Sequence, residues 1–198
     1  MKIPLLPPAL VTPFHGFAIL SGGALLASLL WPDPSVGRAL FLQALVLLQG
    51  ILALQIGEAE YGYGPVAPLA RLFRLFFFSS LAVLLVIPYL LVHRAETAST
   101  WVGFLSSLLF LLAHGFVWAG IGHALPRVVR SDGLRFLVKY GGLILVTVVP
   151  VFFALPVSGI FVLPALWEGR SDGWPGLALY LGLGGLSASW WWRKQRHY

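Results

Sequence analysis

The chain has 198 residues, of which 59% are hydrophobic and only 10% are charged, and its mean hydropathy is +0.88. Because a soluble domain usually carries about 25% charged residues, this composition excludes an ordinary soluble domain and predicts an all-α, polytopic membrane protein with the lipid bilayer as its partner. The net charge of +6 lies in short segments between apolar stretches, which predicts attraction to anionic lipid and no nucleic-acid binding. The absence of cysteine excludes disulfides and thiolate metal sites. The further absence of asparagine is typical of a thermophile or of a GC-rich genome.

Six apolar stretches approach or exceed the length of about 20 residues that a helix needs to cross a bilayer. We expect a single transmembrane domain over 1–198, a six-helix bundle with spans at about 10–30, 39–56, 75–92, 101–125, 137–166 and 176–192. The short connections make consecutive helices antiparallel neighbours. Tryptophans at the predicted span ends support these bounds, because an indole prefers the headgroup region.

The basic residues of the connections predict the orientation in the cell (plasma) membrane, the inner membrane of a bacterium. Ten of the thirteen Lys and Arg residues fall on the side that holds both termini: Lys2, Arg71, Arg74, Arg127, Arg130, Arg135, Lys139, Arg193, Lys194 and Arg196. The opposite side holds Arg38, Arg94 and Arg170. This asymmetry predicts a multi-pass protein with both termini in the cytoplasm.

The fifth stretch is too long for one straight span. Thirty helical residues would extend about 45 Å, whereas the hydrocarbon core is about 30 Å thick. Pro150, Pro156 and Pro164 each remove a helix hydrogen bond. We therefore expect a kinked fifth helix with a half-helix or re-entrant piece, and Pro156, Ser158 and Gly159 as substrate-binding positions of the kind that broken helices form in transporters. The alternative is an ordinary proline kink.

The first and fourth predicted helices share a short pattern. His15 begins a His-Gly-Phe triplet that Gly23 follows, and His114 begins the same triplet, which Gly122 follows at the same offset. With three helices in each half, this similarity indicates a 3+3 inverted repeat. Chance similarity between glycine-rich helices is the alternative.

Ionisable residues within a membrane mark functional sites by default. His15, His123, Glu58 and Glu60 all fall near the cytoplasmic ends of the first, second and fourth helices. They are predicted to line one polar vestibule that binds a divalent metal or relays protons. The alternative is that the two carboxylates are solvated at a helix end. His93, at the outer end of the third helix, is expected to be solvated.

Two histidines on different helices can also hold a haem iron between them. His15 and His114 are the best pair for a b-type haem, because a glycine follows each and small residues let a macrocycle approach. The alternative is that these glycines serve helix packing. His123 lies nine residues after His114, half a turn out of phase, so these two histidines cannot share a ligand.

The segment from His114 to Arg127, HGFVWAGIGHALPR, resembles helices of membrane haem proteins related to the catalytic subunit of haem–copper oxidases. In those helices a histidine opens a glycine-rich stretch that ends in a Leu-Pro-Arg-like turn. The stretch HGFAILSGG from His15 is similar to the same kind of helix. The two segments cover about a tenth of the chain, and the resemblance implies only a haem-ligand role for His15 and His114. Oxygen chemistry is not implied, because the further helices and histidines of an oxidase are missing.

Two classes of function follow from these patterns. The first is a transporter or channel-like bundle, or the membrane subunit of a transporter. The second is a redox membrane subunit with haem b. A structural subunit that binds other membrane subunits is the third, and no hydrolase, metalloprotease or nucleotide-binding motif assigns a catalytic activity.

Overall fold

The computed structural model describes residues 6–63, 67–152, 155 and 157–195, and every regular element among them is helical. In chain order these are α1 (Pro8–Leu29), α2 (Pro34–Gly62), α3 (Pro68–Thr97), α4 (Trp101–Val128), α5 (Asp132–Phe136), η1 (Leu137–Gly141), α6 (Gly142–Phe152), α7 (Gly159–Trp167), η2 (Ser171–Gly173) and α8 (Trp174–Gln195). The all-α class predicted from composition is confirmed.

Local sequence signals explain where the long helices begin. Pro8, Pro34 and Pro68 stand in the first turn of α1, α2 and α3, where the missing N–H of proline costs nothing. The Asp33 carboxylate caps α2 by accepting a hydrogen bond from the amide of Ser35, and the Thr100 hydroxyl caps α4 in the same way. These helices are longer than the predicted apolar spans in the case of α2, α3 and α4. The reason is that hydropathy indicates only the lipid-covered part of a helix and not its polar ends.

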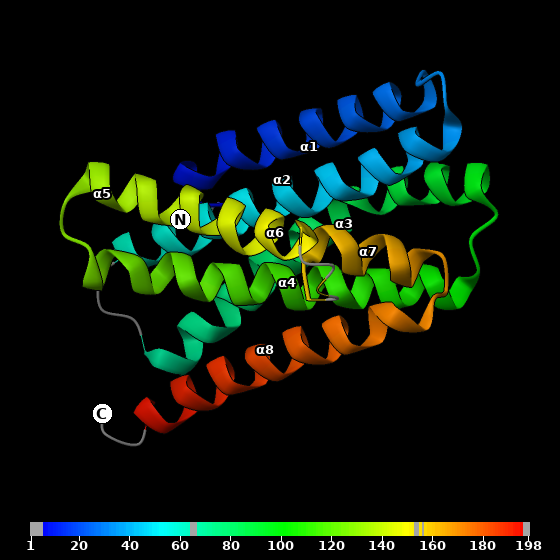
Figure 1. Ribbon diagram of the computed structural model, residues 1–198. Helices are drawn as coiled ribbons and strands as arrows, with labels where there is room; N and C mark the ends of the chain where they lie inside the picture. Colours follow the sequence, from blue (N-terminus) through cyan, green and yellow to red (C-terminus); the bar gives the residue numbers. More distant parts are fainter. Residues whose placement is uncertain (1–5, 64–66, 153–154, 156, 196–198) are drawn as a thin grey trace.

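α2 and α4 form the centre of the bundle (Figure 1). They approach so closely that a Cβ added to Gly57 would lie 2.0 Å from the carbonyl oxygen of Ala119. A Cβ added to Gly122 would lie 2.3 Å from the carbonyl oxygen of Leu54. Such contacts between small residues are how helices associate within a membrane, where lipid removes the hydrophobic driving force. α1 packs on α2, and α8 packs on α4 and α3.

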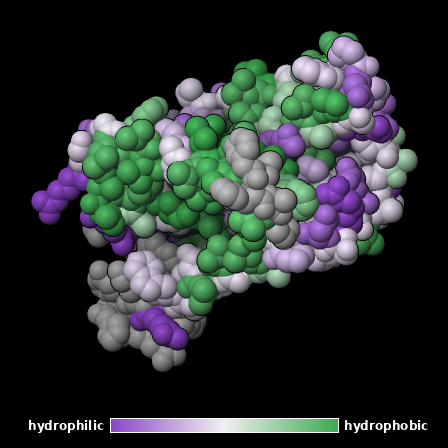
Figure 2. Space-filling view, in the orientation of Figure 1, coloured by the Kyte–Doolittle hydropathy of each residue, from purple (hydrophilic) through white to green (hydrophobic). Residues whose placement is uncertain are grey.

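Within the described residues, five helical segments are long and apolar enough to cross a membrane: α1, α2, α3, α4 and the stretch Asp132–Pro150. Figure 2 shows hydrophobic side chains over much of the visible face, with hydrophilic residues mostly toward the ends of the bundle. Large side chains such as Phe73, Phe77 and Leu145 are exposed on these helices. Lipid would cover such a surface, and the protein therefore has the character of an integral membrane protein.

The last helix, α8, is 22 residues long but is not among those five segments. It begins at the end of the bundle where α1 ends, and it finishes near the end where α1 begins (Figure 1). The sixth span, the orientation in the membrane and the inverted repeat stay predictions. In the predicted topology, the outer end of the bundle holds the connections after α1, α3 and α7. The inner end holds the connections after α2 and α4.

The expected interruption of the fifth stretch is present. α6 ends at Phe152 and α7 begins at Gly159, with Val157 in a turn between them. On the inner side, the π-helical segment η1 joins α5 to α6. The stretch is thus divided into two helical arms, and the longer arm begins at Asp132, five residues before the predicted bound.

Candidate functional site

The break between α6 and α7 lies beside a group of buried polar side chains in the centre of the bundle. His114 on α4 is fully buried, and its Nε2 accepts a hydrogen bond of 3.0 Å from the indole N–H of Trp118. A Cβ added to Gly159, the first residue of α7, would lie 3.5 Å from the same Nε2 atom. Gly159 therefore lets the start of α7 approach His114 directly.

Several polar atoms of this group have no hydrogen-bond partner among the described residues. They are Nδ1 of His114, Oε1 of Gln49 and the hydroxyl of Ser79. The amide of Gln49 donates to the carbonyl oxygen of Leu111 at 2.7 Å, and Gln49 and Ser79 both lie next to Gly115, one residue after His114. An unpartnered buried polar group costs about 1–3 kcal/mol. We call His114, Gln49 and Ser79 the core polar cluster.

Ser158 connects α6 to the start of α7 through hydrogen bonds. Its side chain is fully buried, and its hydroxyl donates to the carbonyl oxygen of Thr147 on α6. Its own carbonyl oxygen accepts from the amides of Phe161 and Val162 in the first turn of α7. Of the three predicted substrate positions, Ser158 and Gly159 thus lie at the break, and Pro156 lies outside the described residues.

The predicted metal ligands at the inner end are held by basic side chains. Glu60 is fully buried and forms a two-pronged ion pair with Arg74 of α3, with a shortest distance of 2.9 Å. Glu58 pairs with Lys139 of η1 and, at 3.5 Å, with Arg135. These contacts neutralise both carboxylates. The basic partners lie 14 positions after Glu60 and 81 positions after Glu58, so the two pairs are not evident from the sequence around the acids.

The two histidines of the predicted vestibule are also separated. His123 is buried, with Arg127 3.0 Å from its Nε2, and its ring contacts Tyr61. His15 is exposed on α1. Among the residues that the structure describes, no three His, Asp or Glu side chains gather as a metal site would require. The expected common vestibule of His15, His123, Glu58 and Glu60 is therefore not assembled here.

The residues do not fit a haem shared by His15 and His114. One histidine is exposed on the outer face of α1 and the other is fully buried beneath α2 and α7. The space beside His114 is filled, because a Cβ on Gly50 would lie 2.7 Å from Leu143, and one on Gly159 would lie 2.7 Å from Val46. The packing of the described residues therefore leaves no slot for a macrocycle at His114.

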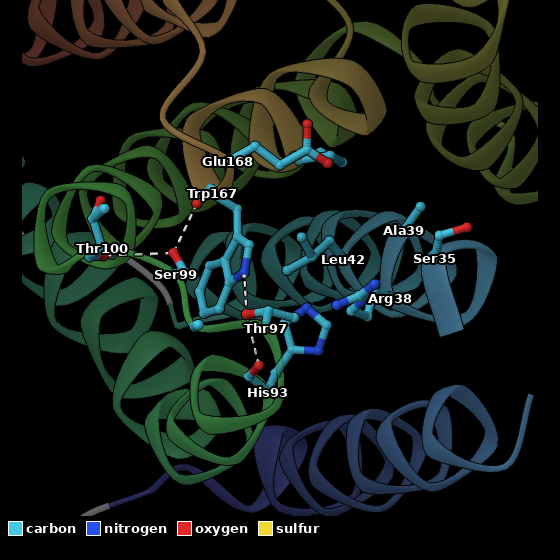
Figure 3. A pocket seen from close by; sticks show the side chains of 12 residues that line it. Ser35, Arg38, Ala39, Leu42, His93, Thr97, Ser99, Thr100, Trp167 and Glu168 are labelled. Carbon is cyan, nitrogen blue, oxygen red and sulfur yellow. Dashed lines mark hydrogen bonds between the residues drawn. The ribbon is translucent and has the colours of Figure 1, made fainter. Parts of the chain in front are cut away.

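A cavity of about 380 Å³ opens at the outer end, between the start of α2, the connection from α3 to α4, and the end of α7 (Figure 3). Trp167 forms one wall. Its indole N–H donates to the hydroxyl of Thr97 at 3.0 Å, and its carbonyl oxygen accepts from the hydroxyl of Ser99 at 2.7 Å. Arg38 and His93 face the same cavity from α2 and α3. We call this space the outer cavity.

His93 corrects the expectation that it is solvated. Only 1% of its surface is exposed, and its ring lies between Phe41 and Trp167, with centroid distances of 4.8 and 5.0 Å. Both ring nitrogens lack a partner among the described residues. Its position at a helix end suggests solvent, but α7 folds back over it. Nothing in the local sequence carries that information.

Arg38 brings a guanidinium to the outer cavity from the start of α2. Its Nε donates to the carbonyl oxygen of Pro34 at 3.0 Å, and within the described part of the chain no carboxylate forms an ion pair with its guanidinium. The nearby carboxylate of Asp33 accepts from the hydroxyl and the amide of Ser35, which lower the pKa of Asp33, and the charge of Arg38 lowers that pKa further. Glu168, on the opposite wall, pairs with Arg170 at 3.1 Å.

Two further cavities face the apolar flanks of the bundle. One of about 430 Å³ lies between α3, α4 and α8, and one of about 280 Å³ lies between α1 and α2. Their linings are almost wholly apolar, with Phe76 and Phe116 in the first and Leu20 and Leu52 in the second. Thr12 and Gln55 are the polar side chains of the second lining, and no charged side chain lines either cavity within the described residues.

Comparison with known proteins assigns no family. No family model matches the chain, and neither curated proteins nor solved structures give a match.

Proposed function

We propose that this protein is a membrane transport protein for a small polar solute, with six spans and both termini in the cytoplasm. The solute path passes the break between α6 and α7. The observation that carries the proposal is that this break lies against His114 of the core polar cluster, in which several buried polar atoms lack partners among the described residues. Polar groups that stay unpaired inside a membrane are costly, and a passing solute would give them partners.

The half-helix α7 supports the same proposal because it connects the two polar regions. Its first residue, Gly159, touches the core polar cluster, and its last residue, Trp167, forms a wall of the outer cavity. Nine helical residues extend about 13 Å. A tilt of α7 would therefore open the outer cavity toward His114, in the way that broken helices act as gates in transporters.

A flux assay in proteoliposomes tests this proposal with solutes of different charge. Labelled succinate, alanine, phosphate and rubidium represent four charge classes. We expect at least one to enter faster than it enters protein-free liposomes. Gly159→Ala should lower that rate at least ten-fold, because the added methyl group would lie 2.7 Å from Val46 and would displace the start of α7 from His114.

Gly182→Ala on α8 is the matched control, because a Cβ there would have no neighbour within 4 Å. Its rate should equal that of the unmodified protein. Both variants must elute as the unmodified protein does from a sizing column. Absence of flux for all four solutes, or equal rates in the two variants, would contradict the proposal.

A b-type haem subunit and a structural subunit remain the alternative functions. The fully buried His114, whose Nδ1 has no partner among the described residues, is the one observation that suits a haem ligand. One absorption spectrum of the purified protein decides this question. A Soret band that shifts on reduction and is lost in His114→Ala would replace the transport proposal by the haem alternative.

A further inference from the structure

The outer cavity combines a guanidinium, an imidazole and apolar side chains. Arg38 forms no ion pair among the described residues, with only the longer-range charge of Asp33 acting on it, and both nitrogens of the buried His93 ring have no partner there. Ala39 and Pro164, both partly exposed, supply apolar surface beside them. A volume of about 380 Å³ is within the usual range of small-molecule sites, about 300–1,000 Å³.

We propose that the outer cavity binds a small organic carboxylate. The carboxylate group bonds to the guanidinium of Arg38 and to the N–H of His93, while the carbon skeleton packs against Ala39 and Pro164. That this carboxylate is also the transported solute rests on the proposed transport function. Binding of the carboxylate in the outer cavity does not depend on transport.

The charges of the cavity select this class of ligand over others. A guanidinium presents parallel N–H donors that match the two oxygens of a carboxylate. A neutral imidazole adds one further donor, and His93 uses neither nitrogen within the part of the protein that the structure describes. A cationic ligand would find the one carboxylate of the described lining, Glu168, already paired with Arg170. A purely inorganic anion would leave the apolar surface of Ala39 and Pro164 without a contact.

The lining is also held in position before any ligand enters. The Thr97 hydroxyl accepts from the indole of Trp167 and donates to the carbonyl oxygen of His93, at 3.0 and 2.8 Å (Figure 3). Ser99 fixes the backbone of Trp167 from the other side. The two ring walls, His93 and Trp167, are thus fixed to each other. Preorganisation of this kind lowers the entropy lost on binding.

Isothermal titration of the purified full-length protein in detergent tests the site. The probes are benzoate, acetate and succinate, with benzamide as the neutral analogue of benzoate and with inorganic phosphate as the inorganic anion. We expect at least one of the three carboxylates to bind saturably with one site per chain. If benzoate is that probe, benzamide should bind at least ten-fold more weakly.

Arg38→Gln should weaken carboxylate binding at least ten-fold, and His93→Phe, which keeps an aromatic ring between Phe41 and Trp167, should weaken it several-fold. Arg130→Gln is the matched control, because Arg130 is an exposed arginine of the inner end. It should bind as the unmodified protein does. A readout in detergent does not depend on flux, so loss of binding and loss of transport are separate results.

Three outcomes would overturn the proposal: no saturable binding of any of the three carboxylates, equal effects of Arg38→Gln and Arg130→Gln, or phosphate binding as tightly as the best carboxylate. Carboxylate binding that depends on Arg38, together with no flux of any solute, would support this site and contradict the transport function. Flux that is sensitive to Gly159→Ala, without carboxylate binding, would support the transport function and contradict this site.

Discussion

At the scale of single residues, some polar side chains of this protein are paired with opposite charges, and others are buried with atoms that lack a partner among the described residues. At the inner end, Glu58 and Glu60 are neutralised by Lys139 and Arg74. In the middle of the bundle, Gln49 and His114 are buried and keep atoms without a partner among the described residues. Pairing avoids the high cost of an isolated charge inside the protein, whereas unpaired polar groups cost stability and suit a function that gives them a partner.

The Glu60–Arg74 pair gives a prediction about stability. Glu60→Gln removes the charge of a fully buried carboxylate and leaves the Arg74 guanidinium without its counter-ion. Breaking a buried pair costs about 3–5 kcal/mol, and because Arg74 is partly exposed we expect about 3 kcal/mol. Thermal unfolding in detergent measures the loss. Glu96→Gln, at an exposed position of α3, should leave the midpoint unchanged, and equal midpoints for the two variants would contradict the importance of the pair.

Individual histidines are the hardest residues of this chain to predict from the sequence. The position of His114 well inside its helix is predictable, because apolar residues and small side chains surround it in the chain. His93 is expected in solvent and is buried, while His15 is expected within the bundle and is exposed. Depth along a helix follows from sequence position. The direction a side chain faces depends on neighbours that are distant in the sequence.

At the scale of elements, the close contact of α2 with α4 gives a second prediction. A methyl group at Gly57 would lie 2.0 Å from the carbonyl oxygen of Ala119, so Gly57→Ala must push the two helices apart. We expect a loss of about 1–3 kcal/mol, the usual cost of overpacking. Gly23→Ala on α1 has no neighbour within 4 Å and should cause no loss. Unfolding of both variants in detergent compares them, and a stable Gly57→Ala protein would show that α2 and α4 pack differently.

In the interrupted fifth stretch, one structural feature can be predicted from the sequence and another cannot. Its three prolines and its excess length are enough to predict a break, since both are properties of the chain itself. The π-helical segment η1 is not predictable from them. It places Lys139 against Glu58, which lies 81 positions earlier in the chain. Such a contact depends on packing between distant helices.

At the scale of the whole molecule, hydropathy is sufficient to predict the all-α class and the apolar character of the surface. The outer cavity cannot be predicted in this way. Its lining comes from the start of α2, both sides of the connection from α3 to α4, and the end of α7. Each of these segments has the sequence of an ordinary helix end, and only the return of α7 toward the outer end brings them together.

The predicted topology can be tested directly because the chain contains no cysteine. Single cysteines at Glu96 and Asp172 should react with a membrane-impermeant maleimide on intact cells, whereas cysteines at Arg130 and Arg193 should react only after the cells are opened. The reason is the excess of basic residues on the inner side. Labelling of Asp172→Cys and Arg193→Cys from the same side would show that α8 does not cross, and a reversed pattern would invert the orientation.

The central claim is that a solute path passes the break between α6 and α7, and the reactivity of Ser158→Cys toward a charged thiol reagent tests it most directly. Ser158 is fully buried beside Thr147, so a closed structural core would protect this position. We predict that Ser158→Cys in membranes reacts more slowly than Glu96→Cys but far faster than Leu145→Cys, which is exposed on α6 where lipid would cover it. Reaction of Ser158→Cys no faster than that of Leu145→Cys, in a folded protein, would contradict a path at this break.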